Sequence, residues 1–199
     1  MLGRPPRRVV SDEQSARYAR HLTLPEVGPE GQRLLNEASI LVVGAGGLGS
    51  PALLYLAAAG IGKIGIIDDD SVDLSNLQRQ VLHGTSSIGE AKVVSAERRL
   101  SDLNPEVTIE AYEARLGVDN ALDLIDSFDL VIDGSDNFST RYLISDACEI
   151  LGKPWCSAVS TDSRVKSPPS ISTGDPTTAT CFPRPLQRSW HQTALRRVC

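Results

Sequence analysis

The 199-residue sequence contains no apolar run that approaches the roughly 20 residues of a membrane-spanning helix. Its first ten residues include Arg4, Arg7 and Arg8, but no apolar segment follows them, so they do not resemble a secretory signal. An excess of positive charge is also lacking, since the net charge is −5. We therefore expect a cytoplasmic protein that binds neither membranes nor nucleic acids, with residues 1–10 disordered.

Cysteine is scarce and is not spaced for a metal site. The four cysteines, Cys148, Cys156, Cys181 and Cys199, form no C-x-x-C pair, which argues against a structural zinc site. A disulfide framework is not expected in a cytoplasmic chain. Cys148 falls in an apolar helical pattern and is interpreted as a packed core thiol.

Short apolar runs rich in β-branched residues alternate with helical patterns along the chain. The runs predict strands at residues 39–43, 63–67, 107–111, 129–133 and 154–159. The helical patterns lie at residues 11–21, 30–36, 50–59, 89–104, 119–127 and 139–151. The sequence therefore predicts an α/β fold of the Rossmann-like, doubly wound kind. We expect a mainly parallel sheet with helices on both faces, preceded by N-terminal helices and followed by an irregular C-terminal part.

A glycine-rich segment, Gly44-Ala-Gly46-Gly47-Leu-Gly49, joins the first predicted strand to a helix. Glycines let the backbone approach phosphate oxygens, and a helix N-terminus offers unpaired N–H groups. Asp68 ends the next predicted strand and could hydrogen-bond a ribose hydroxyl. These features predict a nucleotide site, but they fit a NAD-binding domain as well as an ATP site. Glycines that serve only a tight turn are the less favoured alternative, because the segment lies between a strand and a helix.

The segment from residue 68 to 80, Asp-Asp-Asp-Ser-Val-Asp-Leu-Ser-Asn-Leu-Gln-Arg-Gln, resembles the hallmark of the ubiquitin-activating superfamily, and within it the MoeB/ThiF branch. The resemblance covers residues 11–160, which are expected to form an incomplete ATP-binding adenylation domain. Further matches are Arg17-Tyr-Ala-Arg20, Gly89-x-x-Lys92, Asn104-Pro105 and Asp133-Gly-Ser-Asp-Asn137 with Arg141.

The resemblance implies ATP-dependent adenylylation of the C-terminal glycine carboxylate of a ubiquitin-fold sulfur-carrier protein that ends in Gly-Gly. Pyrophosphate would be released, and molybdopterin, thiamin or related sulfur-transfer biosynthesis would be served. ATP and Mg²⁺ are the implied cofactors. The implied catalytic residues are Arg20, Arg79, Lys92 and Asp136, and Asp136 is also the implied metal ligand. The implied nucleotide-binding residues are Gly44, Gly46, Gly47, Gly49, Asp68, Asp70, Ser75, Asn76, Leu77, Gln78, Arg79, Lys92, Asp136 and Asn137.

In this family the arginine that matches Arg20 comes from the partner subunit and reaches the γ-phosphate. The resemblance therefore implies a homodimer with two composite sites, in which Arg20 acts in trans.

Each of these side chains also has a purely structural alternative. Lys92 taken alone could be a solvated helix residue, and Arg79 could cap a helix or pair with an acidic neighbour. Asp136 could be the N-cap of the helix expected from residue 139. Arg17 and Arg20 could line an exposed helix face. The ordered occurrence of all of them favours the functional interpretation.

Residues 161–199 depart from the family's pattern. They are rich in Pro, Ser and Thr and show no helical or strand periodicity. The family motifs Phe-Glu-Gly-Gln, Tyr-Arg-Asp-Leu and Cys-Ala-Glu-x-Gly are absent, but permitted codons for residues 162–167, 176–183 and 190–198 encode them in another reading frame. We hypothesise a frameshift near residues 155–160, and we expect weak or absent adenylation by this chain.

Two other functions compete with adenylylation. A NAD-dependent oxidoreductase is disfavoured, because nothing in that class explains the Ser75–Arg79 segment together with Lys92. A non-catalytic, dimeric remnant that binds nucleotide is the other alternative.

Overall fold

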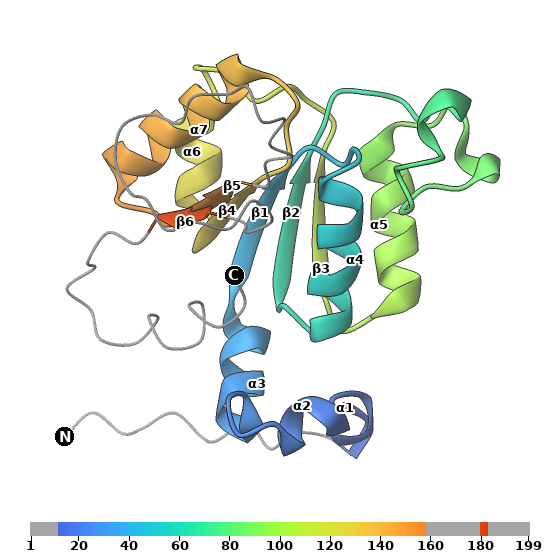
Figure 1. Ribbon diagram of the computed structural model, residues 1–199, viewed down its shortest axis with the longest axis vertical. Coiled ribbons are helices and arrows are strands. Elements are labelled where there is room, and N and C mark those ends of the chain that lie inside the picture. Colours follow the sequence, from blue (N-terminus) through green and yellow to red (C-terminus); the bar gives the residue numbers. More distant parts are fainter. Residues whose placement is uncertain (1–11, 158–179, 183–199) are drawn as a thin grey trace.

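The computed structural model describes residues 12–157 and the backbone of residues 180–182. Its centre is a sheet with the strand order β3-β2-β1-β4-β5-β6 (Figure 1). The first five strands are parallel, and β6 pairs antiparallel with β5. The predicted mainly parallel sheet is therefore confirmed. The strands are β1 (Ser39–Val43), β2 (Lys63–Ile67), β3 (Thr108–Tyr112), β4 (Leu130–Asp133), β5 (Trp155–Ser157) and β6 (Thr180–Phe182).

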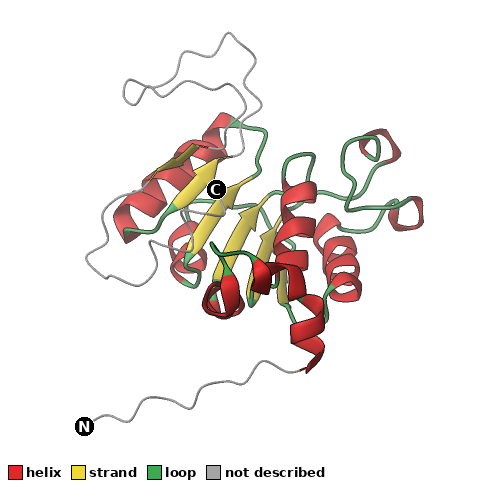
Figure 2. Ribbon diagram, turned by 60° about the horizontal axis from the view of Figure 1, so that its bottom comes forward, coloured by secondary structure: helices red, strands yellow, loops and turns green. Residues whose placement is uncertain are grey.

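The central strand β1 is apolar on both faces because helices cover both (Figure 2). On one face, Ile40 and Val42 pack with helices α4 (Gly49–Ala59) and α5 (Lys92–Leu103). On the other face, Leu41 and Val43 pack with α6 (Ala121–Asp126) and α7 (Phe138–Leu151). This arrangement confirms the doubly wound prediction.

The N-terminal helices pack at the C-terminal ends of α4 and α5. They are α1 (Asp12–Arg17), α2 (Ala19–Thr23) and α3 (Gly28–Glu37). Arg17 Nη1 donates to the carbonyl of Leu103, and Asn104 Nδ2 donates to the Tyr18 hydroxyl and to the carbonyl of Ala57. Figure 1 shows these helices at the opposite end of the sheet from the turn between β1 and α4.

Several boundaries differ from the sequence prediction. The helix expected over residues 11–21 is divided at Tyr18, whose backbone (φ −100, ψ 15) leaves the helical region while its side chain is buried. Gly60 ends α4 in the left-handed region (φ 81), as expected. Two short 3-10 helices, η1 (Leu74–Asn76) and η2 (Thr85–Ser87), were not predicted because they lack a periodic apolar pattern. Cys156 is disulfide-bonded, contrary to the expectation for a cytoplasmic chain.

Among the described residues, no helix is both long enough and apolar enough to cross a membrane. Residue 11, with which the first expected helix began, lies outside the described residues. The same holds for residues 1–10 and for most of the segment 161–199, including Cys199.

Candidate functional site

The candidate site lies at the carboxyl ends of β1 and β4, which are neighbours in the sheet. The chain leaves β1 toward α4 on one face and leaves β4 toward α7 on the other. Such a reversal opens a crevice, and ligands of open α/β sheets bind there. We call residues 44–49 the glycine turn and residues 134–137 the β4 turn.

The two turns are in contact through their glycines. Gly44 has φ 92, and a Cβ placed on it would lie 3.0 Å from the carbonyl oxygen of Gly134. At Gly49 a Cβ would lie 1.8 Å from the carbonyl oxygen of Gly44, which no side chain allows. Both positions therefore require glycine for close packing of backbone on backbone.

Gly46 and Gly47 serve a different purpose. Their N–H groups donate to no acceptor among the described residues, although the Gly46 carbonyl accepts from the N–H of Ser50 at the start of α4. Unpaired N–H groups at a helix N-terminus attract anions. This part of the turn therefore fits the phosphates of a nucleotide.

The peptide groups of Ala45, between these glycines, are fully paired. Its N–H donates to Asp68 Oδ2 (2.7 Å), and its carbonyl oxygen accepts from Ser50 Oγ (3.1 Å) and from the ring of His83 (3.0 Å to Nε2). Ala45 itself has no exposed surface. The backbone immediately before Gly46 and Gly47 is thus held by side chains from the residue after β2, from α4 and from the segment before η2.

Lys92 begins α5 and lies beside the glycine turn. Its Nζ is 2.6 Å from Asp70 Oδ2 and 3.9 Å from Asp68 Oδ1, and Asp68 in turn accepts from Ala45. The Lys92 side chain is 5% exposed. The alternative that Lys92 is a solvated helix residue is therefore wrong, because burial and two carboxylates hold its charge at this end of the sheet.

Arg79 lies against the glycine turn from another side. A Cβ on Gly47 would be 3.5 Å from Arg79 Cγ and Cδ, so the arginine stem runs past this glycine. Its Nη2 donates to Asn76 Oδ1 (2.6 Å), and Asn76 ends η1. Asp73 caps η1 by accepting from the N–H of Ser75. Hydrogen bonding with the Ser75 side chain, and then with its N–H, lowers the pKa of Asp73. The remaining predicted residues of this segment are Leu77, half-buried, and Gln78, exposed.

The β4 turn carries Asp136 and Asn137. Asn137, not Asp136, is the N-cap of α7, since its Oδ1 accepts from the Thr140 N–H (2.9 Å). The alternative of Asp136 as N-cap is therefore wrong. Asp136 is exposed and forms no hydrogen bond within the described part of the chain. A free carboxylate has the chemistry of a Mg²⁺ ligand, and the turn that carries it contacts the glycine turn through Gly134.

An ion pair between the buried Asp133 and the partly exposed Arg141 supports the β4 turn and was not predicted as part of the site. Asp133 has no exposed surface, and its Oδ1 accepts from the N–H and the hydroxyl of Ser135. Its Oδ2 lies 3.8 Å from Arg141 Nε, and Arg141 Nη2 donates to the carbonyl of Ser135. Asp133 and Arg141 therefore fix the peptide that precedes Asp136.

A second acidic group lies at the end of β2. Asp68, Asp69 and Asp70 each bring one carboxylate oxygen within 4.8 Å of the others. Two of these side chains already face Lys92, whereas Asp136 faces no cation within residues 12–157. Asp136 thus stays the better fit for a metal ion. Both oxygens of Asp68 accept backbone N–H bonds, and a carboxylate retains lone pairs that could accept from a ribose hydroxyl.

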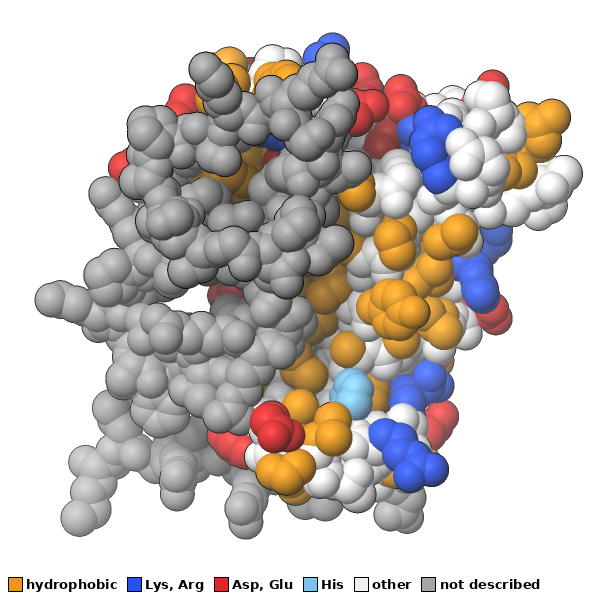
Figure 3. All heavy atoms as spheres, in the orientation of Figure 1, with side chains coloured by type: hydrophobic (Ala, Val, Ile, Leu, Met, Phe, Trp, Pro, Cys, Tyr) orange, Lys and Arg blue, Asp and Glu red, His pale blue; other side chains and the backbone are white. Residues whose placement is uncertain are grey.

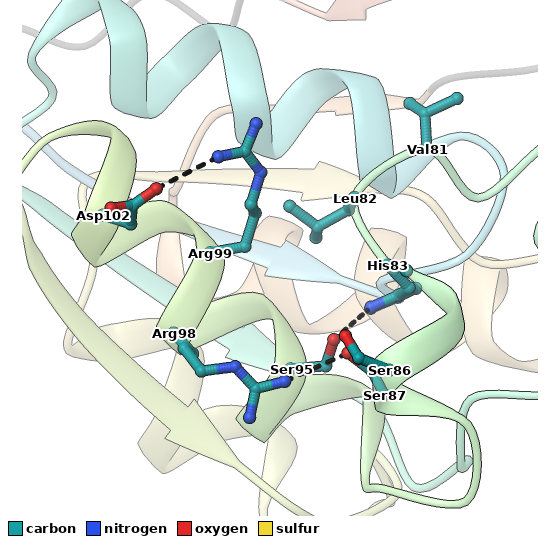
Figure 4. A pocket seen from close by; sticks show the side chains of 10 residues that line it. Val81, Leu82, His83, Ser86, Ser87, Ser95, Arg98, Arg99 and Asp102 are labelled. Carbon is teal, nitrogen blue, oxygen red and sulfur yellow. Dashed lines mark hydrogen bonds and ion pairs between the residues drawn. The ribbon is translucent and has the colours of Figure 1, made fainter.

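Sequence reasoning assigned no role to His83 and did not single out Gln80, yet both lie beside the glycine turn. Gln80 is 4% exposed, its Oε1 has no hydrogen-bond partner, and its Nε2 would be 3.7 Å from a Cβ on Gly46. His83 lines a surface pocket next to Ser95, Arg98 and η2 (Figure 4). No motif spacing pointed to His83, because its partner Ala45 is 38 residues away in the sequence.

Two residues lie away from the site. Arg20 is exposed on α2, at the far end of the sheet. Cys148 is buried in α7 as predicted, and burial raises the pKa of its thiol to about 12. A thiol with this pKa is not a nucleophile at neutral pH.

Comparison with known proteins gives one consistent result. The signature of the ThiF family matches residues 18–195. The chain is 52% identical over 150 residues to a probable adenylyltransferase/sulfurtransferase MoeZ of Mycobacterium tuberculosis, covering 75% of this chain and 38% of that protein. It is 55% identical over 142 residues to a sulfur carrier protein adenylyltransferase of Thermus thermophilus, covering 71% of this chain and 52% of that protein. The chain thus spans about half or less of the length of these relatives.

Among solved structures, the fold is similar to that of the Escherichia coli tRNA N6-threonylcarbamoyladenosine dehydratase TcdA in complex with ATP. The TM-score is 0.71 at 30% identity, covering 75% of this chain and 61% of that one.

Proposed function

Because the chain belongs to the ThiF family, we propose that it is the ATP-binding part of an adenylyltransferase that acts on a ubiquitin-fold sulfur-carrier protein. The carrier's C-terminal glycine carboxylate would attack the α-phosphorus of ATP. The new bond joins a carboxylate oxygen to phosphorus, the bond to the bridging oxygen breaks, and pyrophosphate leaves. The acyl-adenylate would then serve sulfur transfer in molybdopterin, thiamin or related biosynthesis.

The observation that carries this proposal is the surroundings of Gly46 and Gly47. Two unpaired backbone N–H groups lie next to the stem of Arg79, and the buried ammonium of Lys92 is linked to the same turn through Asp68. A triphosphate needs this concentration of donors and positive charge more than the two phosphates of NAD do. The names of the relatives at 52% and 55% identity favour adenylyl transfer, and the second favours a sulfur carrier protein as the acceptor.

Each side chain has a definite task in the proposed reaction. Arg79 and Lys92 would stabilise charge that moves onto the departing pyrophosphate. Asp136 would hold Mg²⁺, which supplies further positive charge to the phosphates when bound. Asp68 would accept from a ribose hydroxyl. The ordered turns would hold the reacting groups in line, which lowers the barrier by removing orientational freedom before the reaction.

ATP–pyrophosphate exchange tests this function directly. We expect label from pyrophosphate to enter ATP only when a carrier protein with an intact C-terminal Gly-Gly is present, and more slowly than with a full-length relative. The matched control is the same carrier without its two terminal glycines. Tight ATP binding without carrier-dependent exchange would support the non-catalytic remnant instead, and binding of NAD in preference to ATP would support the oxidoreductase.

We also propose a homodimer in which Arg20 completes the site of the partner subunit. Arg20 follows α1, which contacts the C-terminal end of α5, whereas Lys92 begins α5 and so lies a full helix length away. A 12-residue helix is about 18 Å long, beyond the reach of an arginine side chain. Within one chain Arg20 therefore cannot approach the glycine turn.

Helix α4 supports association with a second copy. Its sequence is apolar all round, and such helices are normally covered. Figure 3 shows apolar side chains gathered over α4, and Tyr55 of this helix is 78% exposed. An exposed apolar surface of this kind is typical of a protein–protein contact.

Mixing two inactive variants tests the composite site. The Arg20→Ala subunit cannot complete the site of its partner. The Lys92→Ala subunit has a defective site of its own but can still supply Arg20 to its partner. Random exchange of subunits makes half of the dimers mixed, and each mixed dimer has one intact site, so about a quarter of the wild-type exchange activity should return. An equal mixture that stays as inactive as its components would contradict Arg20 acting in trans.

A further inference from the structure

His83 has no task in the reaction proposed above, yet it contacts the nucleotide turn. Its Nε2 lies 3.0 Å from the carbonyl oxygen of Ala45, and its Nδ1 lies 3.0 Å from Ser95 Oγ on α5. The side chain is 7% exposed and Ser95 is 2% exposed. The ring therefore connects the glycine turn to the first turn of α5 through two buried hydrogen bonds, of which Figure 4 shows the one to Ser95.

The chemistry of the partners fixes the tautomer. A carbonyl oxygen can only accept, so Nε2 must carry the proton that it donates to Ala45. In the neutral ring Nδ1 then accepts from the Ser95 hydroxyl. Burial lowers the pKa of His83, and the Lys92 ammonium lowers it further, whereas the bond to Ala45 and the carboxylates of Asp68 and Glu90 raise it.

The bond from His83 completes the pairing of the Ala45 backbone. Asp68 holds the N–H of this residue, while His83 and Ser50 hold its carbonyl. The next two residues, Gly46 and Gly47, follow this fixed backbone directly. Their N–H groups have no hydrogen-bond partner among the described residues. Rotation of the Ala45 carbonyl away from His83 would also turn the N–H of Gly46, because both belong to the same peptide unit.

We propose that His83 is a positioning residue for the triphosphate: its Nε2–H holds the Ala45–Gly46 peptide so that the N–H groups of Gly46 and Gly47 stay available to phosphate oxygens. The inference rests on the proposed function, because ATP is the ligand. His83 touches neither the substrate nor the reacting atoms, and it acts through the backbone of the turn.

Two substitutions separate the hydrogen bond to Ala45 from general packing. Gln places its amide nitrogen near the position of histidine Nε2, so His83→Gln can still donate to Ala45. Asn places its amide near Nδ1, so His83→Asn can reach Ser95 but not Ala45. Both variants replace the ring by a neutral amide. If the ring only fills space, the two substitutions should weaken ATP binding equally.

Equilibrium titration of the full chain with ATP–Mg²⁺ gives the first readout. We expect His83→Asn to bind ATP about tenfold more weakly and His83→Gln to stay within about threefold of wild type, as for loss or retention of one buried hydrogen bond. In the exchange assay the KM for ATP should rise in His83→Asn, while the KM for the carrier protein stays unchanged. Equal ATP affinities of the two variants would overturn the proposal.

A second readout does not need nucleotide. Nitrogen NMR of the full chain with labelled histidine reports which ring nitrogen carries the proton. We expect a neutral ring with the proton on Nε2 at pH 7.5, and a proton on Nδ1 would overturn the proposal even if the variants failed to fold. If wild type shows no carrier-dependent exchange, the adenylylation function would be contradicted, but the role of His83 in ATP binding would not. If wild type shows normal exchange but the two variants bind ATP equally well, the role of His83 would be contradicted and the adenylylation function would stand.

Discussion

The glycine turn and the β4 turn meet at one end of the sheet but are held by different chemistry. In the glycine turn, backbone packs on backbone at Gly44 and Gly49, and a neutral histidine helps to hold the Ala45 peptide. In the β4 turn, a fully buried carboxylate and Arg141 hold the peptide of Ser135. The first turn presents N–H donors, suited to phosphate, and the second presents a free carboxylate, suited to a cation. Because the two turns are in contact, the N–H donors and the free carboxylate lie at the same end of the sheet.

The largest expected effect comes from Gly49→Ala in the glycine turn. The added Cβ would lie 1.8 Å from the Gly44 carbonyl oxygen, so backbone must move. We expect the free energy of unfolding to fall by about 3 kcal/mol, at the upper end for overpacking. Urea unfolding followed by circular dichroism measures the change.

Gly47→Ala is the matched control for that substitution. Its Cβ would make ordinary contacts of 3.5 Å with Arg79, so stability should change by less than about 0.5 kcal/mol. Similar destabilisation by both alanines would contradict the assignment of Gly49 to packing and Gly47 to the ligand side of the turn.

Asp133→Asn should have the next largest effect, through the β4 turn. The substitution removes the charge that faces Arg141 and weakens the bonds to Ser135, all within a fully buried site. We expect a loss of about 2 kcal/mol in the free energy of unfolding, as for hydrogen bonds to a charged group. Thermal and urea unfolding both measure it.

Asp136→Asn tests whether the free carboxylate of the β4 turn binds a cation. Asp136 is exposed and unpaired among the described residues, so stability should change by less than about 0.5 kcal/mol. Carrier-dependent exchange should nevertheless fall by about 100-fold, as when one electrostatic contact to the transition state is removed. Unchanged exchange in Asp136→Asn would exclude Asp136 as the metal ligand.

The smallest expected effect is a pH dependence that comes from His83, which holds the glycine turn at Ala45. The pKa of His83 lies below its ordinary value of 6.5 in the folded protein, mainly through burial. Below pH 6.5 the unfolded chain therefore binds this proton before the folded one does, so acidification favours unfolding. The stability that His83 contributes is complete above pH 6.5 and is lost as the pH falls toward the folded pKa, by at most about 1.4 kcal/mol per pH unit.

Urea unfolding at a series of pH values measures this dependence. His83→Gln should flatten the curve as the pH falls below 6.5, whereas the slope at more acidic pH, which carboxylates dominate, should stay. An identical slope in wild type and His83→Gln would show that His83 titrates alike in both states.

The sequence predicted the strands and the glycine turn well because each depends on residues close together in the chain. β1 and β2 have the predicted bounds, and the short apolar runs needed no distant information. Gly44, Gly46, Gly47 and Gly49 lie where the strand–turn–helix pattern placed them. The family resemblance supplied Arg79, Lys92 and Asp136, which local periodicity alone would have assigned to solvent or to a helix cap.

The sequence could not predict the residues that hold the turns in place. His83 contacts Ala45 across 38 residues, and Asp133 contacts Ser157 across 24. No fixed spacing marks such pairs, because the fold alone brings them together. The burial of Lys92 could not be predicted from the sequence either, because a charged residue at the start of a helix normally faces water.

The central claim is that the two turns converge on the triphosphate of ATP, and ligand-dependent thermal unfolding tests it most directly. At ATP–Mg²⁺ about 100 times its dissociation constant, binding adds roughly 2.7 kcal/mol, which raises the Tm of a chain of this size by about 5–10 °C. NAD at the same concentration should leave the Tm unchanged. An equal rise with NAD, or no rise with ATP–Mg²⁺, would contradict the account.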